Sequence, residues 1–138
     1  MTKRILIMGL PGAGKTTLAE KLHDILNAKG NRVVWLNADR VRAEYNDWDF
    51  SLEGRIRQSK RMYQLSTVLD ADFVLADFVA PLAEMRRIFN ADITVWVDTV
   101  KESLYNDTDI LFTKPSPCDF HITEQDAERW AKIIGDSL

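Results

Sequence analysis

The most constraining feature of the chain is the junction between a short apolar run and a glycine-rich loop. Residues 5–8 read ILIM, and this continuous apolar run, closed by Gly9, predicts a strand buried on both faces. From Lys15 to about Lys29, leucine and isoleucine recur at helical spacing, and Gly30 is a natural helix stop. A strand, a glycine loop and a helix in this order predict the first half of a βαβ unit.

The glycine loop matches a phosphate-binding pattern. Gly9, Gly14, Lys15 and Thr16 fit G-x-x-x-x-G-K-[ST] without a gap. The glycines let the backbone curl so that consecutive N–H groups point at phosphate oxygens, and the helix N-terminus adds partial positive charge. Lys15 supplies a cation for the outer phosphates, and the Thr16 hydroxyl can ligate Mg²⁺. The pattern predicts an ATP site formed by Gly9, Leu10, Pro11, Gly12, Ala13, Gly14, Lys15, Thr16 and Thr17.

The rest of the chain alternates apolar runs with amphipathic segments. Further strands are predicted at 33–36, 73–76, 93–97 and 120–122, and helices at about 52–69, at about 82–89 and after residue 123. Ser51 and Thr123 are the expected caps of the first and last of these helices. The alternation predicts an α/β fold: a three-layer α/β/α arrangement of the P-loop nucleoside triphosphate hydrolase type, with a five-stranded parallel sheet.

The 138 residues suffice for one compact domain, so a single P-loop domain over 1–138 is expected. Within it, the segment at about 101–118 is polar, holds two prolines and is long for a connection. Such a segment predicts a lid or binding loop, with an ordinary surface loop as the alternative.

Composition and charge exclude several classes. A formal net charge of −3 disfavours a nucleic-acid partner, and Cys118 as the only cysteine excludes an intramolecular disulfide or a cysteine metal cluster. No apolar run approaches the roughly 20 residues of a membrane span. Residues 1–9 lack the apolar core of a signal peptide, so a cytoplasmic protein without a membrane partner is expected.

The phosphate loop alone does not specify the reaction. The N-K-x-D motif of GTPases and the L-S-G-G-Q motif of ABC-type ATPases are both missing, and the chain is too short for a motor core. A small-molecule kinase remains, a class in which short size and a lid are expected.

Polar residues near predicted strand ends indicate the acceptor side, because ligands of open α/β sheets bind there. Asp39 follows the second strand and is placed to act as base or to hold a Mg²⁺-bound water, with Arg42 as an anion clamp. Arg55 and Gln58 share one helix face by their i, i+3 spacing. Asp77 ends the third strand, where an aspartate can orient Mg²⁺.

Each of these residues has a structural alternative. Asp39 could cap a helix, and Arg55 could form an exposed ion pair along its helix. Phe50 and Phe78 could be core aromatics.

A family resemblance rests on five stretches, in the order GLPGAGKTTLA, DRVRAEYN, FSLEGR, DFVAP and VWVDT. They resemble the adenylylsulfate kinases over about residues 3–100, and more loosely from residue 119 on. That family typically shows G-L-S-G-A-G-K-[ST]-T, D-N-V-R-x-G-L-N, F-S-x-x-D-R-x-E-N-x-R-R and S-F-I-S-P. It phosphorylates the 3′-hydroxyl of adenosine 5′-phosphosulfate with ATP, so the resemblance implies this small-molecule partner. A homodimer would also fit the family.

The resemblance implies roles for individual residues. Lys15 and Asp39 would be catalytic, Arg55 would grip the phosphosulfate, and Phe50 and Phe78 would sandwich the acceptor's adenine. The expected substrate-binding residues are Asp39, Arg42, Asn46, Phe50, Arg55, Gln58, Phe78 and Val79, and the expected metal-binding residues are Thr16 and Asp77.

The chain also departs from the family pattern. Gln58 stands in place of an asparagine, Gly54 in place of an aspartate, and Ala80 in place of a serine, so no phosphoserine can form there. The family's D-x-K-G-L-Y-K-K-A-R segment is replaced by KESLYNDTDILFTKP, which keeps only Lys101 and Lys114 as cations.

Two other functions stay open. One is a P-loop kinase of another small acceptor: a sugar, a nucleoside or a polynucleotide end. The other is an ATP-binding module without transfer. Contacts to the ATP adenine are expected within 115–118.

Overall fold

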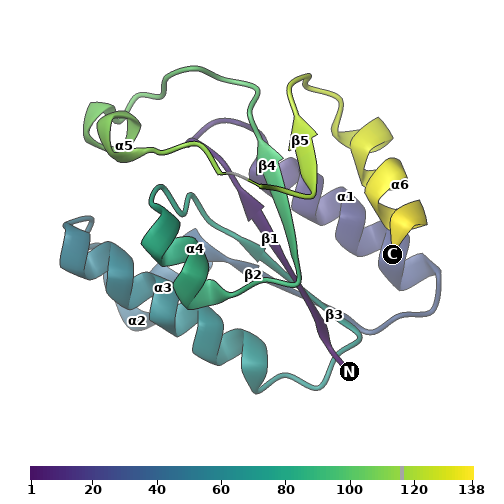
Figure 1. Ribbon diagram of the computed structural model, residues 1–138. Helices are drawn as coiled ribbons and strands as arrows, with labels where there is room; N and C mark the ends of the chain where they lie inside the picture. The colour runs from purple at the N-terminus through teal and green to yellow at the C-terminus, as the bar shows by residue number, and fades with distance from the viewer. Residues whose placement is uncertain (116) are drawn as a thin grey trace.

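A single parallel sheet organises the chain (Figure 1). The structure, a computed structural model, describes residues 1–115 and 117–138, and in this part of the chain the sheet has five strands. Their order across the sheet is β2-β3-β1-β4-β5. The strands are β1 (Lys3–Met8), β2 (Val33–Asn37), β3 (Phe73–Asp77), β4 (Ile93–Val97) and β5 (Phe120–Ile122). All five strands predicted from the apolar runs are confirmed, with ends shifted by at most two residues.

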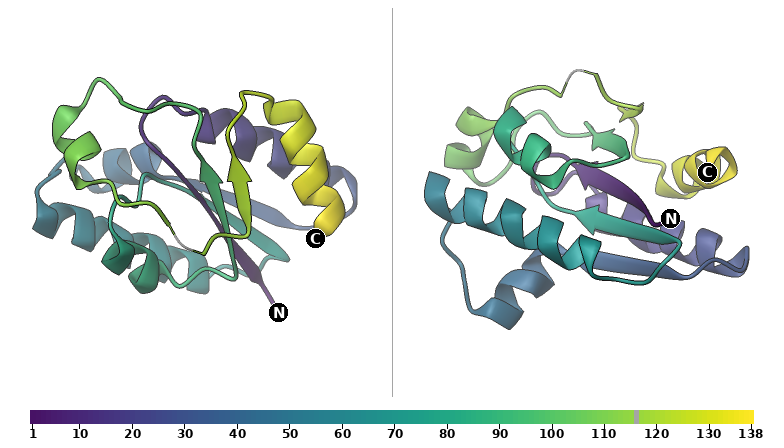
Figure 2. Two further views of the ribbon diagram at one scale, coloured as in Figure 1. Left: turned by 45° about the horizontal axis from the view of Figure 1, so that its top comes forward. Right: turned by 60° about the horizontal axis from the view of Figure 1, so that its bottom comes forward.

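Helices cover both faces of the sheet (Figure 2). They are α1 (Lys15–Ala28), α2 (Ala38–Tyr45), α3 (Leu52–Thr67), α4 (Ala83–Phe89), α5 (Asn106–Leu111) and α6 (Ala127–Ser137). The buried side chains of α1 and α6 pack on one face, and those of α2, α3 and α4 pack on the other. This division follows from right-handed crossovers, because the chain moves from β1 toward one edge through α1 and returns toward the other edge through α3 and α4. The predicted three-layer α/β/α arrangement is confirmed.

The central strand β1 shows why the sheet is sandwiched. Ile5 and Ile7 pack toward the α1 and α6 side, while Leu6 and Met8 pack toward the α3 and α4 side. All four side chains are fully buried, so a continuous apolar run is what this strand requires.

Two features of the helices differ from the sequence-based expectations. The helix α2 was expected only in the alternative that Asp39 caps a helix, and α5 lies inside the segment predicted as a polar lid or loop. The last helix begins at Ala127, and its cap is Asp126, whose carboxylate accepts from the Arg129 N–H at 3.2 Å. Thr123 as the cap was therefore wrong, because a cap must reach the N–H groups of the first turn. Ser51 does cap α3, accepting from the Gly54 N–H at 3.2 Å.

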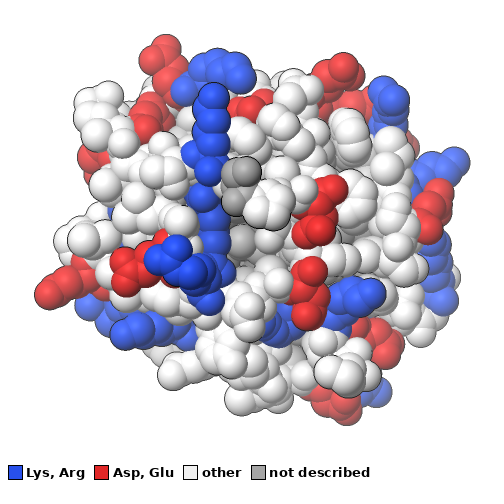
Figure 3. Space-filling model, viewed as in Figure 1, with Lys and Arg blue, Asp and Glu red and all other residues white. Residues whose placement is uncertain are grey.

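The outer surface carries charges of both signs. Over the face seen in Figure 3, Lys and Arg side chains are interspersed with Asp and Glu side chains. Over residues 1–115 and 117–138, no helix is both long enough and apolar enough to cross a membrane.

Candidate active site

The glycine loop joins β1 to α1 at the carboxyl edge of the sheet, where ligands of such sheets bind. Gly9, Gly12 and Gly14 have positive φ values of 153°, 84° and 98°, which other residues rarely adopt. At Gly9 a side chain is also excluded by space, because a Cβ there would lie 2.3 Å from the Val97 carbonyl oxygen. The Thr99 hydroxyl, beyond β4, donates to the Ala13 carbonyl at 2.6 Å and holds the loop from outside.

Lys15 is the cation of this loop and is only 9% exposed. Its ammonium donates to the Leu10 carbonyl at 3.0 Å, so the side chain folds back over the loop. Burial lowers the pKa of Lys15, and the nearby carboxylates of Asp77 and Asp39 partly offset this by raising it. A bound anion such as a nucleotide phosphate would place a compensating negative charge beside this buried ammonium.

Asp77, at the end of β3, forms the polar centre of the site. One of its carboxylate oxygens accepts from the Thr16 hydroxyl and from the Asn37 amide, both at 3.0 Å. Burial raises the pKa of Asp77, and Lys15 acts in the opposite direction. Hard divalent cations prefer hydroxyl and carboxylate oxygens, so Thr16 and Asp77 fit a Mg²⁺ that also binds nucleotide phosphates. Over the described residues, no group of three or more His, Cys, Asp or Glu side chains forms a separate metal site.

Two cavities border the glycine loop. The larger, of about 820 Å³, is lined by Pro11, Gly12, Gly14, Lys15, Thr16, Asn37, Ala38, Asp39, Trp48, Phe50, Arg55, Asp77, Phe78, Val79, Tyr105, Asp107 and Thr108. The smaller, of about 340 Å³, is lined by Ala13, Gly14, Thr17, Leu18, Val97, Thr99, Ile122, Glu124, Gln125, Asp126, Ala127 and Trp130. Of the predicted loop residues, Gly9 and Leu10 line neither cavity and serve the packing beneath the loop.

The larger cavity brings together five of the eight residues predicted to bind the acceptor: Asp39, Phe50, Arg55, Phe78 and Val79. Asp39 is exposed in the first turn of α2, and Asn37 is the cap of that helix, so a capping role for Asp39 is wrong. Phe50 is 47% exposed at the cavity rim, which excludes a core role for it. Phe78 is 6% exposed and packs edge-on against Phe89, so it belongs both to the core and to the cavity wall.

The other three predicted acceptor residues do not line the cavity. Gln58 donates to the Ala38 carbonyl at 3.2 Å and so ties α3 to α2. Arg42 is 4% exposed and donates to the backbone carbonyls of Asp47 and Asp49, while its guanidinium lies 4.2 Å from the centre of the Phe50 ring. Asn46 is exposed and ends α2 with a left-handed φ of 50°.

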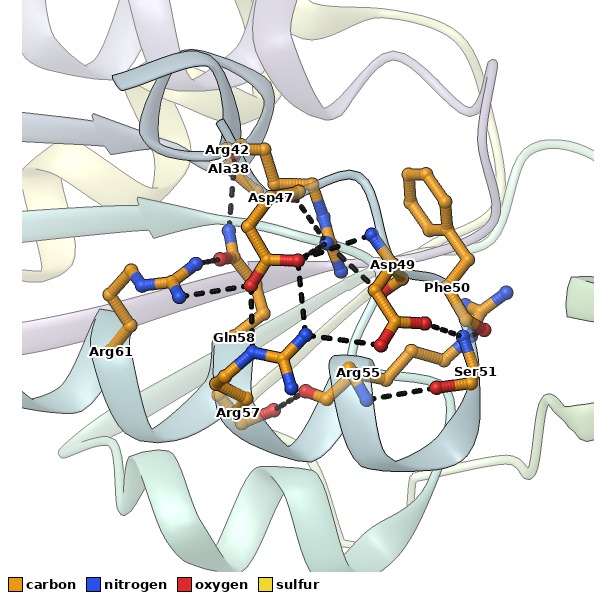
Figure 4. Close-up of polar contacts among 12 residues, drawn as sticks. Ala38, Arg42, Asp47, Asp49, Phe50, Ser51, Arg55, Arg57, Gln58 and Arg61 are labelled. Carbon is orange, nitrogen blue, oxygen red and sulfur yellow. Dashed lines mark hydrogen bonds and ion pairs between the residues drawn. The ribbon is translucent and has the colours of Figure 1, made fainter. Parts of the chain in front are cut away.

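These contacts shape what we call the acceptor rim, residues 46–50 between α2 and α3 (Figure 4). Asp47 is its central carboxylate, and Figure 4 shows Arg57 and Arg61 of α3 directed at it, with N–O distances of 2.8 and 3.0 Å. Hydrogen bonds from Arg57 and Arg61 hold the pKa of Asp47 well below its usual range. The rim is thereby fastened to α3.

Gly54 allows the rim to lie close to α3. A Cβ at Gly54 would lie 2.1 Å from the Asp49 carbonyl oxygen, a distance that no side chain tolerates. The aspartate that the family pattern has at this position would collide with the rim. A glycine is therefore required at position 54 for the rim to lie this close to α3.

Arg55 joins the rim to the lid segment. Its side chain donates to the Phe50 carbonyl and to the Thr108 hydroxyl of α5, both at 2.8 Å. The Asp107 carboxylate lies 3.7 Å away. Burial lowers the pKa of Arg55, and Asp107 partly offsets this. An exposed ion pair along the helix is wrong for Arg55, because its side chain is 7% exposed and faces another segment.

Several cavity residues were not predicted from the sequence. Asn37 stands at a strand end, two residues before Asp39, and the strand-end argument could have found it. Trp48, Tyr105, Asp107 and Thr108 carry no periodic or motif signal.

The lid segment lines the larger cavity with side chains of α5. Its lysines, Lys101 and Lys114, do not line either cavity, and Lys101 lies 3.8 Å from Asp98. Pro115, Pro117 and Cys118 line neither cavity, and residue 116 lies outside the described residues, so the adenine contacts expected within 115–118 stay a prediction.

The sheet order, the G-x-x-x-x-G-K-T loop after the central strand and the strand-end aspartate define a P-loop nucleotide-binding fold. The sequence model of the family described as Adenylylsulphate kinase matches residues 1–114, and the chain belongs to this family.

Individual relatives agree with this assignment. The probable adenylyl-sulfate kinase of Aeropyrum pernix is 34% identical over 87 residues, which are 61% of this chain and 48% of that protein. The adenylyl-sulfate kinase of Burkholderia ambifaria is 34% identical over 107 residues, which are 71% of this chain and 59% of that protein. A mutant of the Mycobacterium tuberculosis APS kinase CysC has a similar structure, with a TM-score of 0.80 at 26% identity over 98% of this chain and 95% of that chain. The matched region covers about half the length of these two curated relatives.

Proposed function

We propose that this protein transfers the γ-phosphoryl group of ATP to the 3′-hydroxyl of adenosine 5′-phosphosulfate. The observation that carries the proposal is that the glycine loop, Asp39, Arg55, Phe50 and Phe78 open onto one cavity of about 820 Å³. This volume lies within the roughly 300–1,000 Å³ usual for small-molecule sites. Family membership supports the same acceptor.

On the donor side, the backbone of the glycine loop binds the phosphates and Lys15 neutralises charge on the outer ones. Mg²⁺ held by Thr16 and Asp77 would neutralise further charge on the nucleotide. The smaller cavity suits the donor base, because Gly14 and Thr17 lie in its wall next to the phosphate positions.

On the acceptor side, Phe50 and Phe78 offer aromatic surfaces to a flat purine, and Arg55 offers its guanidinium to the phosphosulfate. Asp39 lines the same cavity as Lys15, and its carboxylate raises the pKa of that lysine, which supports a role for Asp39 at the transferred group. It orients the attacking hydroxyl or accepts its proton. Because the transition state of phosphoryl transfer is loose, a carboxylate held at this position matters more than a tuned pKa of that carboxylate.

A coupled ADP-release assay with and without adenosine 5′-phosphosulfate tests the proposal. We expect release that depends on this acceptor and is lost in Lys15→Met. Release that requires a sugar, a nucleoside or a polynucleotide end instead would assign the protein to another small-acceptor kinase. Tight ATP binding without release in the presence of any of them would identify an ATP-binding module without transfer.

A further inference from the structure

The guanidinium of Arg55 already has partners from the lid segment. Its Nη2 donates to the Thr108 hydroxyl at 2.8 Å, and the Asp107 carboxylate lies 3.7 Å from the same nitrogen. Arg55 and Thr108 are 7% and 4% exposed, so their hydrogen bond is shielded from water. Arg55 is also the arginine of the cavity wall that faces the acceptor, so an acceptor anion and α5 would use the same guanidinium.

The charged side chains of the cavity wall also indicate that the site attracts an anionic acceptor only weakly. Its wall holds two cations, Lys15 and Arg55, and three carboxylates, Asp39, Asp77 and Asp107. Lys15 and Asp77 belong to the glycine-loop end, which leaves Arg55 with Asp39 and Asp107 at the acceptor end. Even when Arg42, which lies behind the Phe50 ring, is counted with these three side chains, this end has no net positive charge to attract a doubly charged acceptor.

We propose that Asp107 and Thr108 determine the specificity of the acceptor site by occupying Arg55 until an acceptor anion displaces them. The site then selects its acceptor mainly by ring and hydroxyl, and only weakly by negative charge. This inference rests on the proposed function for the purine acceptor. Because α5 and the anion compete for one guanidinium, the coupling is reciprocal: an anion on Arg55 loosens α5, and a loosened α5 strengthens anion binding.

Two probes separate charge from ring recognition. Adenosine and 5′-AMP share the ring and the 3′-hydroxyl, and they differ only in the anion at the 5′ position. Their affinities are measured by calorimetry at fixed salt, with the donor site filled by a non-hydrolysable ATP analogue. The variants are Asp107→Asn, Thr108→Val and the control Glu102→Gln, which removes one charge from an exposed position of the same segment outside the cavity wall.

For Asp107→Asn we expect the preference for 5′-AMP over adenosine to rise about twofold to fivefold, the size of a partly exposed ion pair. For Thr108→Val we expect a rise of about tenfold, because a buried guanidinium N–H is left without its partner. Glu102→Gln should leave the preference unchanged. An unchanged preference in both test variants, or an equal rise in the control, would overturn the proposal.

Hydrogen–deuterium exchange of residues 106–111 tests the contact without any acceptor. Exchange should be faster in Asp107→Asn and Thr108→Val than in Glu102→Gln, and 5′-AMP but not adenosine should speed it in the wild-type protein. Slower exchange with 5′-AMP would contradict competition for Arg55. If neither probe binds any variant, recognition by ring and hydroxyl is contradicted and this inference with it, whereas the proposed function is decided separately by ADP release that depends on adenosine 5′-phosphosulfate. If residues 106–111 exchange at the same rate in Asp107→Asn, Thr108→Val and Glu102→Gln, this result by itself contradicts the contact between α5 and Arg55.

Discussion

The two sides of the cavity that the proposed function assigns to donor and acceptor are built in opposite ways. The donor side consists of consecutive residues 9–17, in which backbone N–H groups and one lysine provide the binding groups. The acceptor side is assembled from α2, the acceptor rim, α3, the end of β3 and α5. Changes on the donor side should therefore act directly on phosphate binding, whereas many changes on the acceptor side should act through positioning.

The largest expected effect is on the donor side, in Lys15→Met. Turnover should fall at least about 100-fold, because the charge that develops on the transferred phosphoryl loses its stabilising cation. The melting temperature should stay close to that of the wild type, because methionine fills similar space and burial already disfavours the ammonium. ADP release and thermal unfolding measure the two outcomes. Lys132→Met, at an exposed position of α6, is the control and should change neither. Undiminished turnover of Lys15→Met would contradict the kinase proposal.

Asp39→Asn tests most directly whether a change on the acceptor side leaves ATP binding on the donor side intact. The amide keeps the size of the side chain and cannot accept the hydroxyl proton, so kcat should fall by about 100-fold or more. The affinity for ATP should change little, because the loop binds the phosphates. Single-turnover kinetics and ATP titration report these two quantities. Equal kcat in mutant and wild type would remove Asp39 from the mechanism.

Gly54→Ala tests whether the acceptor side depends on the position of its rim. The added methyl group would collide with the Asp49 carbonyl, so the rim must move away from α3 and carry Phe50 with it. We expect the KM for the acceptor to rise about tenfold, which corresponds to a loss of roughly 1.4 kcal/mol of binding free energy. The KM for ATP should stay within about twofold of the wild-type value.

Gly30→Ala is the matched control for this change. A Cβ at Gly30 meets no atom within 4 Å, although its φ of 91° makes alanine strained. It should lower stability by about 1–2 kcal/mol and leave both KM values unchanged. An acceptor KM of Gly54→Ala equal to that of Gly30→Ala would show that the rim does not position the acceptor.

The smallest expected effect is a pH-dependent loss of stability in Asp47→Asn. The hydrogen bonds from Arg57 and Arg61 hold the pKa of Asp47 well below its usual range, so its ionised form stabilises the folded chain. This contribution is fully present above the ordinary aspartate pKa of about 4 and is lost as the pH falls through the lower folded-state value. The melting temperature of Asp47→Asn should lie below that of the wild type at pH 7, and the gap should narrow below about pH 4.

Asp70→Asn is the control for the pH series. Asp70 pairs with Arg32 at 3.0 Å, but their side chains are 99% and 67% exposed, so the pair should contribute little at any pH. If the difference in melting temperature between Asp47→Asn and the wild type stays constant from pH 7 to pH 3, the rim is held by packing rather than by the carboxylate.

Much of the fold could be read from the chain because its signals are local. Each of the five strands is an apolar run, and the glycine loop is a contiguous pattern that requires positive φ values at fixed positions. The helix α2 was missed because its eight residues are mostly polar, and its cap, Asn37, closes the preceding strand. The cap of α6 was placed three residues early, because Thr123 and Asp126 are both good capping residues and only the backbone geometry decides between them.

The sequence by itself determined the donor loop and the class of protein, because a phosphate loop works through neighbouring backbone groups and one adjacent lysine. Only the tertiary structure decided what the polar side chains of the acceptor side do. Arg42 and Gln58 turn toward backbone carbonyls, whereas Arg55 faces the cavity and bonds Thr108, 53 residues further along the chain. A guanidinium can bind a ligand, a carbonyl or a hydroxyl with similar geometry. Which of these it meets depends on the segments that the fold brings beside it.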